Sequence, residues 1–75
     1  SVVYIELRAC DEILSTLPEK VIASMFVNEE KYLVVSNLDD KDYTLKLRDA
    51  WSDRVGGNTA REFVVKPGKI LFLKK

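Results

Sequence analysis

Strict alternation of apolar and polar residues over residues 43–48, Tyr-Thr-Leu-Lys-Leu-Arg, constrains the fold of this chain more than any other feature. In an extended strand, a period of two residues puts the apolar side chains on one face and the polar side chains on the other. One face of such a strand packs against a core and the other meets water, as in an antiparallel sheet. The sequence therefore predicts a β-rich domain around this strand.

The same period of two begins earlier in the chain, at residue 21. Residues 21–27 alternate, the polar cluster at residues 28–31 follows, and a second apolar run occupies residues 32–37. Two such runs separated by a short polar segment predict a β-hairpin. A second polar turn, residues 39–42, then leads into the strand at residues 43–48.

Two further strands are expected near the end of the sequence. Gly56 and Gly57 mark a loop, and residues 62–65 with residues 70–73 are expected to form a last hairpin. Its turn contains the dipeptide Pro-Gly at positions 67 and 68, which suits a type II turn.

The first 17 residues fit a different period. At 100° per residue most of their apolar side chains fall in one broad arc, which predicts an amphipathic helix that ends before Pro18. The competing interpretation is a strand over residues 2–8, where apolar and polar residues also alternate. The predicted fold class is mostly β (α+β): an N-terminal amphipathic helix (residues 1–17), then a five- to six-stranded antiparallel sheet or small β-sandwich (residues 18–75).

Composition excludes several classes of function. The chain has 75 residues and twelve charges of each sign, so its net charge of zero provides no electrostatic footprint for nucleic acid or an anionic membrane surface. No apolar run approaches the roughly 20 residues of a membrane-spanning helix. Without histidine and with Cys10 as its one cysteine, the chain has neither Ser-His nor Cys-His pairs, and no internal disulfide. We therefore expect no catalytic residues, no cofactor and no metal site.

Three aromatic residues are candidates for contact with a sugar or another domain: Trp51, Tyr32 and Tyr43. Aromatic rings stack on sugars, yet a single Trp after a strand more often anchors a core or a domain interface. We therefore expect Trp51 to be mostly buried. Asp39 to Asp42 contains three carboxylates, but such turns form for backbone reasons and lack the spacing of a calcium loop.

The second half of the chain resembles the C-terminal antiparallel β domain of glycoside hydrolases of the α-galactosidase-like and α-amylase-like barrel families. The similar elements are the strand ending in Asn37-Leu38, the polar turn and strand that follow, Arg48-Asp49-Ala50-Trp51, a glycine, and a Pro-containing turn before the closing strand. The resemblance covers roughly residues 21–75. Ala50 and Gly68 depart from the residues usual at those places.

The resemblance implies a non-catalytic accessory domain that packs on and stabilises a catalytic barrel of the same polypeptide, with residues 1–17 as the last helix of that barrel. Part of the helix, around Val2, Ala9 and Ile13, would then be left for another domain or for self-association of the isolated chain. Two alternatives remain: an autonomous carbohydrate-binding module that uses Trp51 and a tyrosine, and a small protein-interaction β domain.

Overall fold

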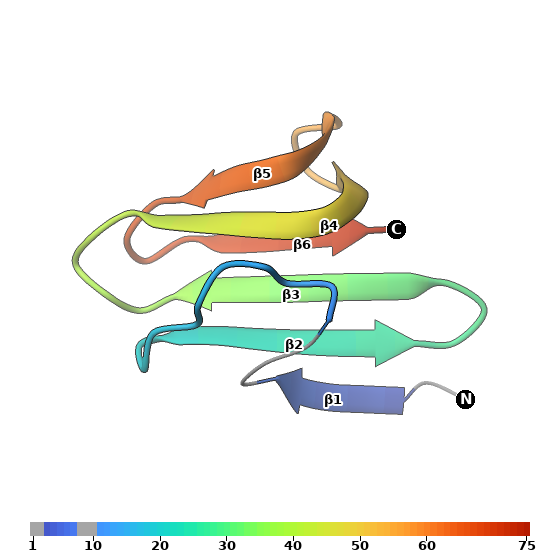
Figure 1. Ribbon diagram of the computed structural model, residues 1–75, viewed down its shortest axis with the longest axis horizontal. Helices are drawn as coiled ribbons and strands as arrows, with labels where there is room; N and C mark the ends of the chain where they lie inside the picture. Colours follow the sequence, from blue (N-terminus) through green and yellow to red (C-terminus); the bar gives the residue numbers. More distant parts are fainter. Residues whose placement is uncertain (1–2, 8–10) are drawn as a thin grey trace.

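The computed structural model describes residues 3–7 and 11–75, and these residues form one antiparallel sheet (Figure 1). Its six strands have the spatial order β1-β2-β3-β6-β4-β5. They are β1 (Val3–Leu7), β2 (Val21–Val27), β3 (Lys31–Asn37), β4 (Tyr43–Asp53), β5 (Thr59–Val65) and β6 (Ile70–Lys74). The predicted antiparallel sheet is confirmed. No helix among the described residues is long and apolar enough to span a membrane.

The predicted N-terminal helix is wrong for the part of the chain that the structure describes. Residues 3–7 form strand β1, which pairs with β2 in the register Val3↔Val27 to Leu7↔Ala23. Residues 11–17 are turn and irregular chain, and the remaining positions of the expected helix, including Val2, Ala9 and Cys10, lie outside the described residues. The helical pattern arose because the apolar residues of an edge strand and of the segment after it share one arc when projected at 100° per residue.

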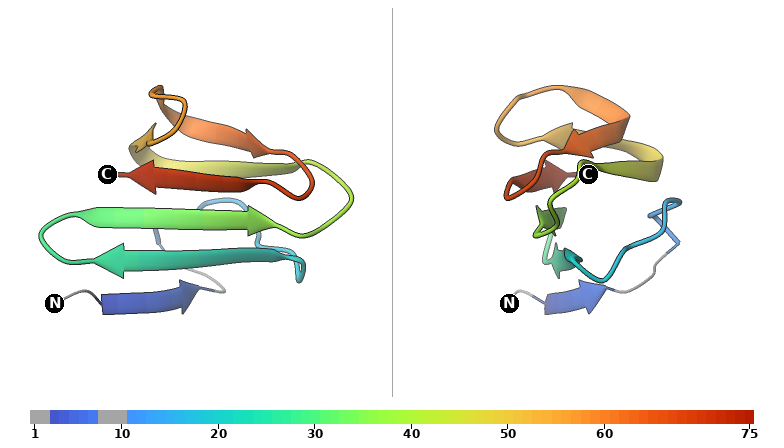
Figure 2. Two further views of the ribbon diagram at one scale, coloured as in Figure 1. Left: turned by 180° about the vertical axis from the view of Figure 1, so that it is seen from behind. Right: turned by 90° about the vertical axis from the view of Figure 1, so that its left-hand side faces the viewer.

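Residues 11–17, which we call the strap, cross the concave side of the sheet (Figure 1). The backbone N–H of Leu14 donates to the carbonyl of Lys46 at 2.7 Å, and the N–H of Arg48 donates to the carbonyl of Glu12 at 3.0 Å. These bonds flank a bridge between Ile13 and Leu47. The end-on view in Figure 2 shows the sheet curling and the strap standing over its hollow side.

The core fills the space between the curled sheet and the strap. Ile13 is part of it, so this residue is not left over for another domain as the helix had implied. The other buried apolar residues come from β2 to β6: Val21, Ala23, Leu33, Val35, Tyr43, Leu45, Leu47, Trp51, Phe63, Val65, Leu71 and Leu73. Burial of these side chains supplies the main favourable contribution to folding.

Strand β6 does not pair with β5, so the expected last hairpin is also wrong. The turn itself has the expected features: the N–H of Lys69 donates to the carbonyl of Lys66 at 3.1 Å, and Gly68 has a φ of 73°. After the turn, however, β6 crosses β4 and enters between β3 and β4. It pairs with β3 from Tyr32↔Lys74 to Ser36↔Ile70.

Strand β4 makes this crossing possible because it changes partners along its length. Its first residues pair with β5, and the register shifts between Lys46 and Trp51. At its end, Ser52 pairs with both β5 and β6, whereas Asp53 pairs with β6 alone. A bulge of this kind bends a strand, and here it brings Trp51 into the core with 0% of its surface exposed.

Asn37, at the end of β3, is fully buried and joins three parts of the chain. Its side-chain Nδ2 donates to the carbonyl of Lys41 at 2.7 Å and to the carbonyl of Val65 at 2.9 Å. Its Oδ1 accepts from the N–H of Asp39 at 3.0 Å, and its own carbonyl accepts from the N–H of Gly68 at 2.8 Å. The side-chain amide thereby joins the turn before β4 to the end of β5, and the backbone carbonyl of the same residue holds the turn before β6.

Replacing this amide should be costly. Asn37→Ala removes three side-chain hydrogen bonds and leaves the buried carbonyl of Val65 without that donor, so we expect the free energy of unfolding to fall by about 2–4 kcal/mol. Urea denaturation followed by circular dichroism measures the change. Asn58→Ala, at an exposed loop position, should stay within about 0.5 kcal/mol of the parent.

Asn37→Asp separates hydrogen bonding from shape. The introduced carboxylate offers no donor to the two carbonyls, so burial should raise its folded-state pKa above the unfolded value. Stability is then lost as the pH rises through the folded pKa, and the gap between variant and parent should be smaller at pH 4 than at pH 7. A gap that is independent of pH would contradict the assigned role of the amide.

Candidate functional site

The most distinctive surface feature is an apolar groove on the convex side of the sheet, the side seen in the left view of Figure 2. Its volume is about 370 Å³. Among the residues that the structure describes, those that line it are Phe26, Asn28, Tyr32, Val34 and Phe72. They project from adjacent strands of the sheet and from the turn between β2 and β3, on the face opposite the strap.

Strand register explains why these side chains meet. Phe26 lies opposite Tyr32, and Val34 lies opposite Phe72, so neighbouring rungs of β2, β3 and β6 each contribute an apolar side chain. The rings of Tyr32 and Phe72 pack at a centroid distance of 5.7 Å and an interplanar angle of 40°. Phe72 keeps 39% of its surface exposed. Three hydrogen-bonded neighbouring strands therefore position the lining of the groove.

One rim of the groove is charged. The hydroxyl of Tyr32 donates to Glu30 Oε2 at 2.6 Å, and Lys74 Nζ lies 3.0 Å from Glu30 Oε1. The hydrogen bond from Tyr32 and the contact with Lys74 lower the pKa of Glu30, and the same carboxylate raises the pKa of Tyr32. Glu30 therefore remains an anion with both oxygens engaged.

Arg54 lies beside this rim. Its backbone N–H donates to the carbonyl of Phe72 at 2.8 Å. Its charge adds to the lowering of the pKa of Glu30 by Tyr32 and Lys74, and it partly offsets the rise that Glu30 causes in the pKa of Tyr32. The preceding residue, Asp53, orders the loop, since its Oδ1 accepts from the N–H groups of Val55 and Gly56. A left-handed Gly57, with a φ of 81°, then reverses the chain.

The three aromatic candidates from the sequence do not form one site. Trp51 is enclosed in the core, as expected of an anchor residue, with Lys75 Nζ 5.8 Å from its ring centroid. Tyr43 is buried, and its hydroxyl donates to the carbonyl of Thr16 at 2.8 Å and contacts Ser15 Oγ at 2.9 Å. Burial raises the pKa of Tyr43. Only Tyr32 lies in the groove.

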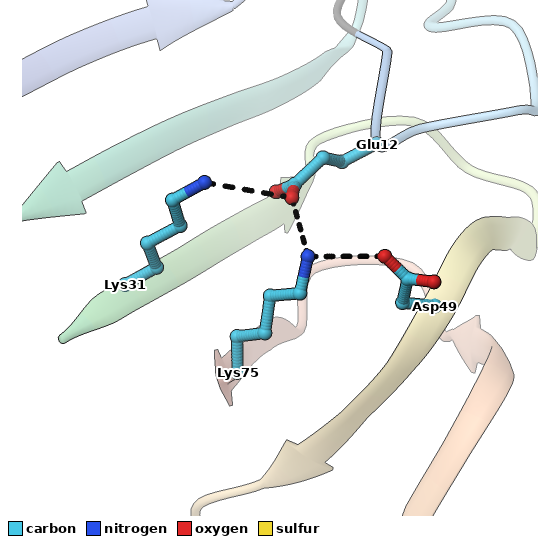
Figure 3. A network of polar contacts seen from close by, with 4 residues as sticks. All are labelled: Glu12, Lys31, Asp49 and Lys75. Atoms are coloured by element: carbon cyan, nitrogen blue, oxygen red, sulfur yellow. Dashed lines mark hydrogen bonds and ion pairs between the residues drawn. The ribbon is translucent and has the colours of Figure 1, made fainter.

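A second polar cluster, shown in Figure 3, holds the strap to the sheet. Lys75 Nζ lies 2.6 Å from Glu12 Oε1 and 3.1 Å from Asp49 Oδ2, and Lys31 Nζ lies 3.6 Å from the same oxygen of Glu12. Glu12 and then Asp49 raise the pKa of Lys75, while Lys75 lowers the pKa of Asp49. Each charge has an opposite partner, so the cluster serves the fold.

The acidic turn is built by local hydrogen bonds. Asp39 Oδ1 accepts from the N–H of Asp40 at 2.8 Å, and Asp42 Oδ2 pairs with Lys66 Nζ at 3.0 Å. Residues 11–75 contain no group of three or more His, Cys, Asp or Glu side chains that could hold a metal ion. The carboxylates of this turn therefore act on the backbone and on a neighbouring lysine.

Comparison with protein-family models, with curated proteins and with solved structures finds no match for this chain. The assignment of the site therefore depends on its own geometry.

Sequence reasoning missed most of the groove. Phe26 and Phe72 stand out only as apolar residues at positions where a one-sided strand would be polar. The apolar stretches over β2, β3 and β6 carry this signal, because strands that read as near-continuous apolar runs bury or offer both faces. Arg54 had no signal at all, since its place beside Phe72 depends on the unexpected pairing of β4 with β6.

The charged rim can be tested by titration. Glu30→Gln removes the carboxylate that raises the pKa of Tyr32, so we expect that pKa to fall toward its ordinary value of about 10. NMR titration of the tyrosine ring carbons measures it. The pKa of Tyr43, raised by burial, should not move, and Glu29→Gln should leave Tyr32 as in the parent. An unchanged Tyr32 in Glu30→Gln would refute the contact.

Proposed function

We propose that this chain is a non-catalytic accessory β domain that docks, through the convex face of its sheet, on a catalytic barrel domain of the same polypeptide. The glycoside hydrolase part of this proposal comes from the sequence resemblance alone. The observation that carries the docking role is the apolar groove with its exposed Phe72.

Burial on the two faces of the sheet supports a docking role. The concave side is filled by the core and covered by the strap, whereas the convex side presents apolar side chains to solvent. Ile70 is 68% exposed on the same side as Phe72, and Val64 on β5 is 53% exposed. Ile70 and Phe72 are two residues apart on the same strand and face, and clustered exposed apolar residues mark interaction sites more often than isolated ones do. A partly aromatic, exposed sheet face is suited to packing against another folded domain.

The polar groups near the groove also favour a protein surface as the partner. Asn28 Oδ1 accepts from the N–H of Glu30 at 3.0 Å, and both carboxylate oxygens of Glu30 are bonded. Few acceptors are therefore left for the hydroxyl groups of a sugar. An apolar occupant needs no such partners.

A carbohydrate-binding module is the second candidate, because described residues place three aromatic rings in the groove, those of Phe26, Tyr32 and Phe72. In this version Tyr32 keeps the role expected from the sequence, while Trp51, being enclosed in the core, supplies no platform. NMR titration of the isotope-labelled chain with soluble gluco-, galacto- and manno-oligosaccharides distinguishes the two candidates. Saturable chemical-shift changes confined to the groove residues would favour the module.

Docking is tested with Phe72→Ser, which removes an exposed ring and leaves the concave core intact. The isotope-labelled domain is mixed with the separately expressed remainder of its polypeptide. We expect NMR line broadening at the groove residues of the parent and little broadening in the variant. A cooperative thermal unfolding transition of the variant should confirm that it is folded.

Leu38→Ser is the matched control, since Leu38 is exposed at the opposite end of β3 from Tyr32. It should bind like the parent. Broadening along β5 or the strap instead of the groove would overturn the assigned face. A coding region without a second folded domain would overturn the accessory role itself.

A further inference from the structure

The charges at the rim of the groove are not balanced. Two cations, Lys74 and Arg54, and one carboxylate, Glu30, lie along it, and Glu30 is already paired with Lys74 at 3.0 Å. Within the part of the chain that the structure describes, the ion pairs join other residues and leave Arg54 without a carboxylate partner. The rim therefore carries a net positive charge.

The position of Arg54 is fixed on the backbone side. Its N–H donates to Phe72, the residue whose ring lines the groove, and Asp53 holds the loop that follows. Its charge is felt by both Glu30 and Tyr32. A long, charged side chain is thus tethered next to the apolar surface, and guanidinium groups pair with carboxylates through two parallel hydrogen bonds.

The shape of the groove sets the size of its occupant. About 370 Å³ is at the lower end of the range of about 300–1,000 Å³ for small-molecule sites, enough for one or two large apolar side chains. Buried aromatic or aliphatic anchors of that kind dominate binding at protein interfaces.

We propose that the groove receives an apolar anchor side chain of the docking partner that has a carboxylate beside it, with the apolar group among Phe26, Tyr32 and Phe72 and the carboxylate on Arg54. This inference rests on the proposed docking function and adds the chemistry of the contact. Charge complementarity at the rim, together with the apolar lining, selects a protein segment that is both apolar and acidic.

The test uses two small probes of nearly the same shape, 3-phenylpropionate and 3-phenylpropanamide, with the isotope-labelled chain in NMR titrations. Both should shift the groove residues with dissociation constants on the order of 1–10 mM, as expected for such small ligands. The carboxylate should bind roughly twofold to fivefold more tightly at low salt, because the added contact is a solvent-exposed ion pair. Raising the salt concentration should reduce this preference.

Two variants assign the preference. Arg54→Gln should make the two probes bind equally while both still occupy the groove, and Arg61→Gln, an exposed arginine on β5, should keep the preference of the parent. Phe72→Ser should weaken both probes.

Three results would overturn the inference. The first is the lack of a preference that depends on Arg54: the two probes bind the parent equally, or the preference for the carboxylate survives in Arg54→Gln. This result leaves the docking proposal intact if both probes occupy the groove. The second is the absence of groove shifts with both probes, in which case docking is judged by the mixing experiment with Phe72→Ser. The third is affinity that climbs steadily from butyrate to decanoate, because it would assign the groove to an acyl chain.

Discussion

The arrangement of this sheet depends on the buried side chain of Asn37. Its side-chain amide donates to carbonyls before β4 and at the end of β5, and its backbone carbonyl accepts from the N–H of Gly68 before β6. A buried amide is tolerated only when its donors and acceptors are paired, so this position accepts one local geometry and rejects others. The backbone bonds of Asn37 with Gly68 and Lys69 hold the turn before β6 at the end of β3, and β6 then pairs along β3. The groove depends on this placement, because β3 and β6 supply Tyr32, Val34 and Phe72.

The two faces of the sheet differ in what covers them. The concave face gains stability from the core and from the strap, which is held by the bridge of Ile13 with Leu47 and by the ion pairs of Glu12. The convex face carries large apolar side chains that the described residues leave more exposed than those of the core. Ile70 and Phe72 are the most exposed of them on β6. These exposed side chains are the observation on which the proposed docking role depends.

The sequence predicted strands from alternation and turns from Gly, Pro and Asp, and β2, β3 and β4 lie close to where alternation put them. The prediction from sequence was wrong where one local pattern was compatible with two structures. Residues 3–7 satisfy both a strand and a helical arc, and pairing with β2 decides between them. Likewise the Pro67-Gly68 turn was correct, yet a turn does not choose the strand's neighbour. Trp51 was recognised as an anchor because of its size. The groove was missed because Arg54 and Phe72 meet only through the pairing of β4 with β6.

The crossing of β6 also has a kinetic consequence. The hairpin of β2 with β3 and the pair of β4 with β5 are local in sequence and can form early, but they join into one sheet only when β6 pairs with both β3 and β4. Contacts between residues far apart in the chain are the slow ones to form. Until that step, β3 and β4 each present an open edge, the kind of surface on which separate chains join into aggregates. Strand β6 thus joins the two halves of the native sheet, and its insertion removes the two open edges of β3 and β4 that could pair with another chain.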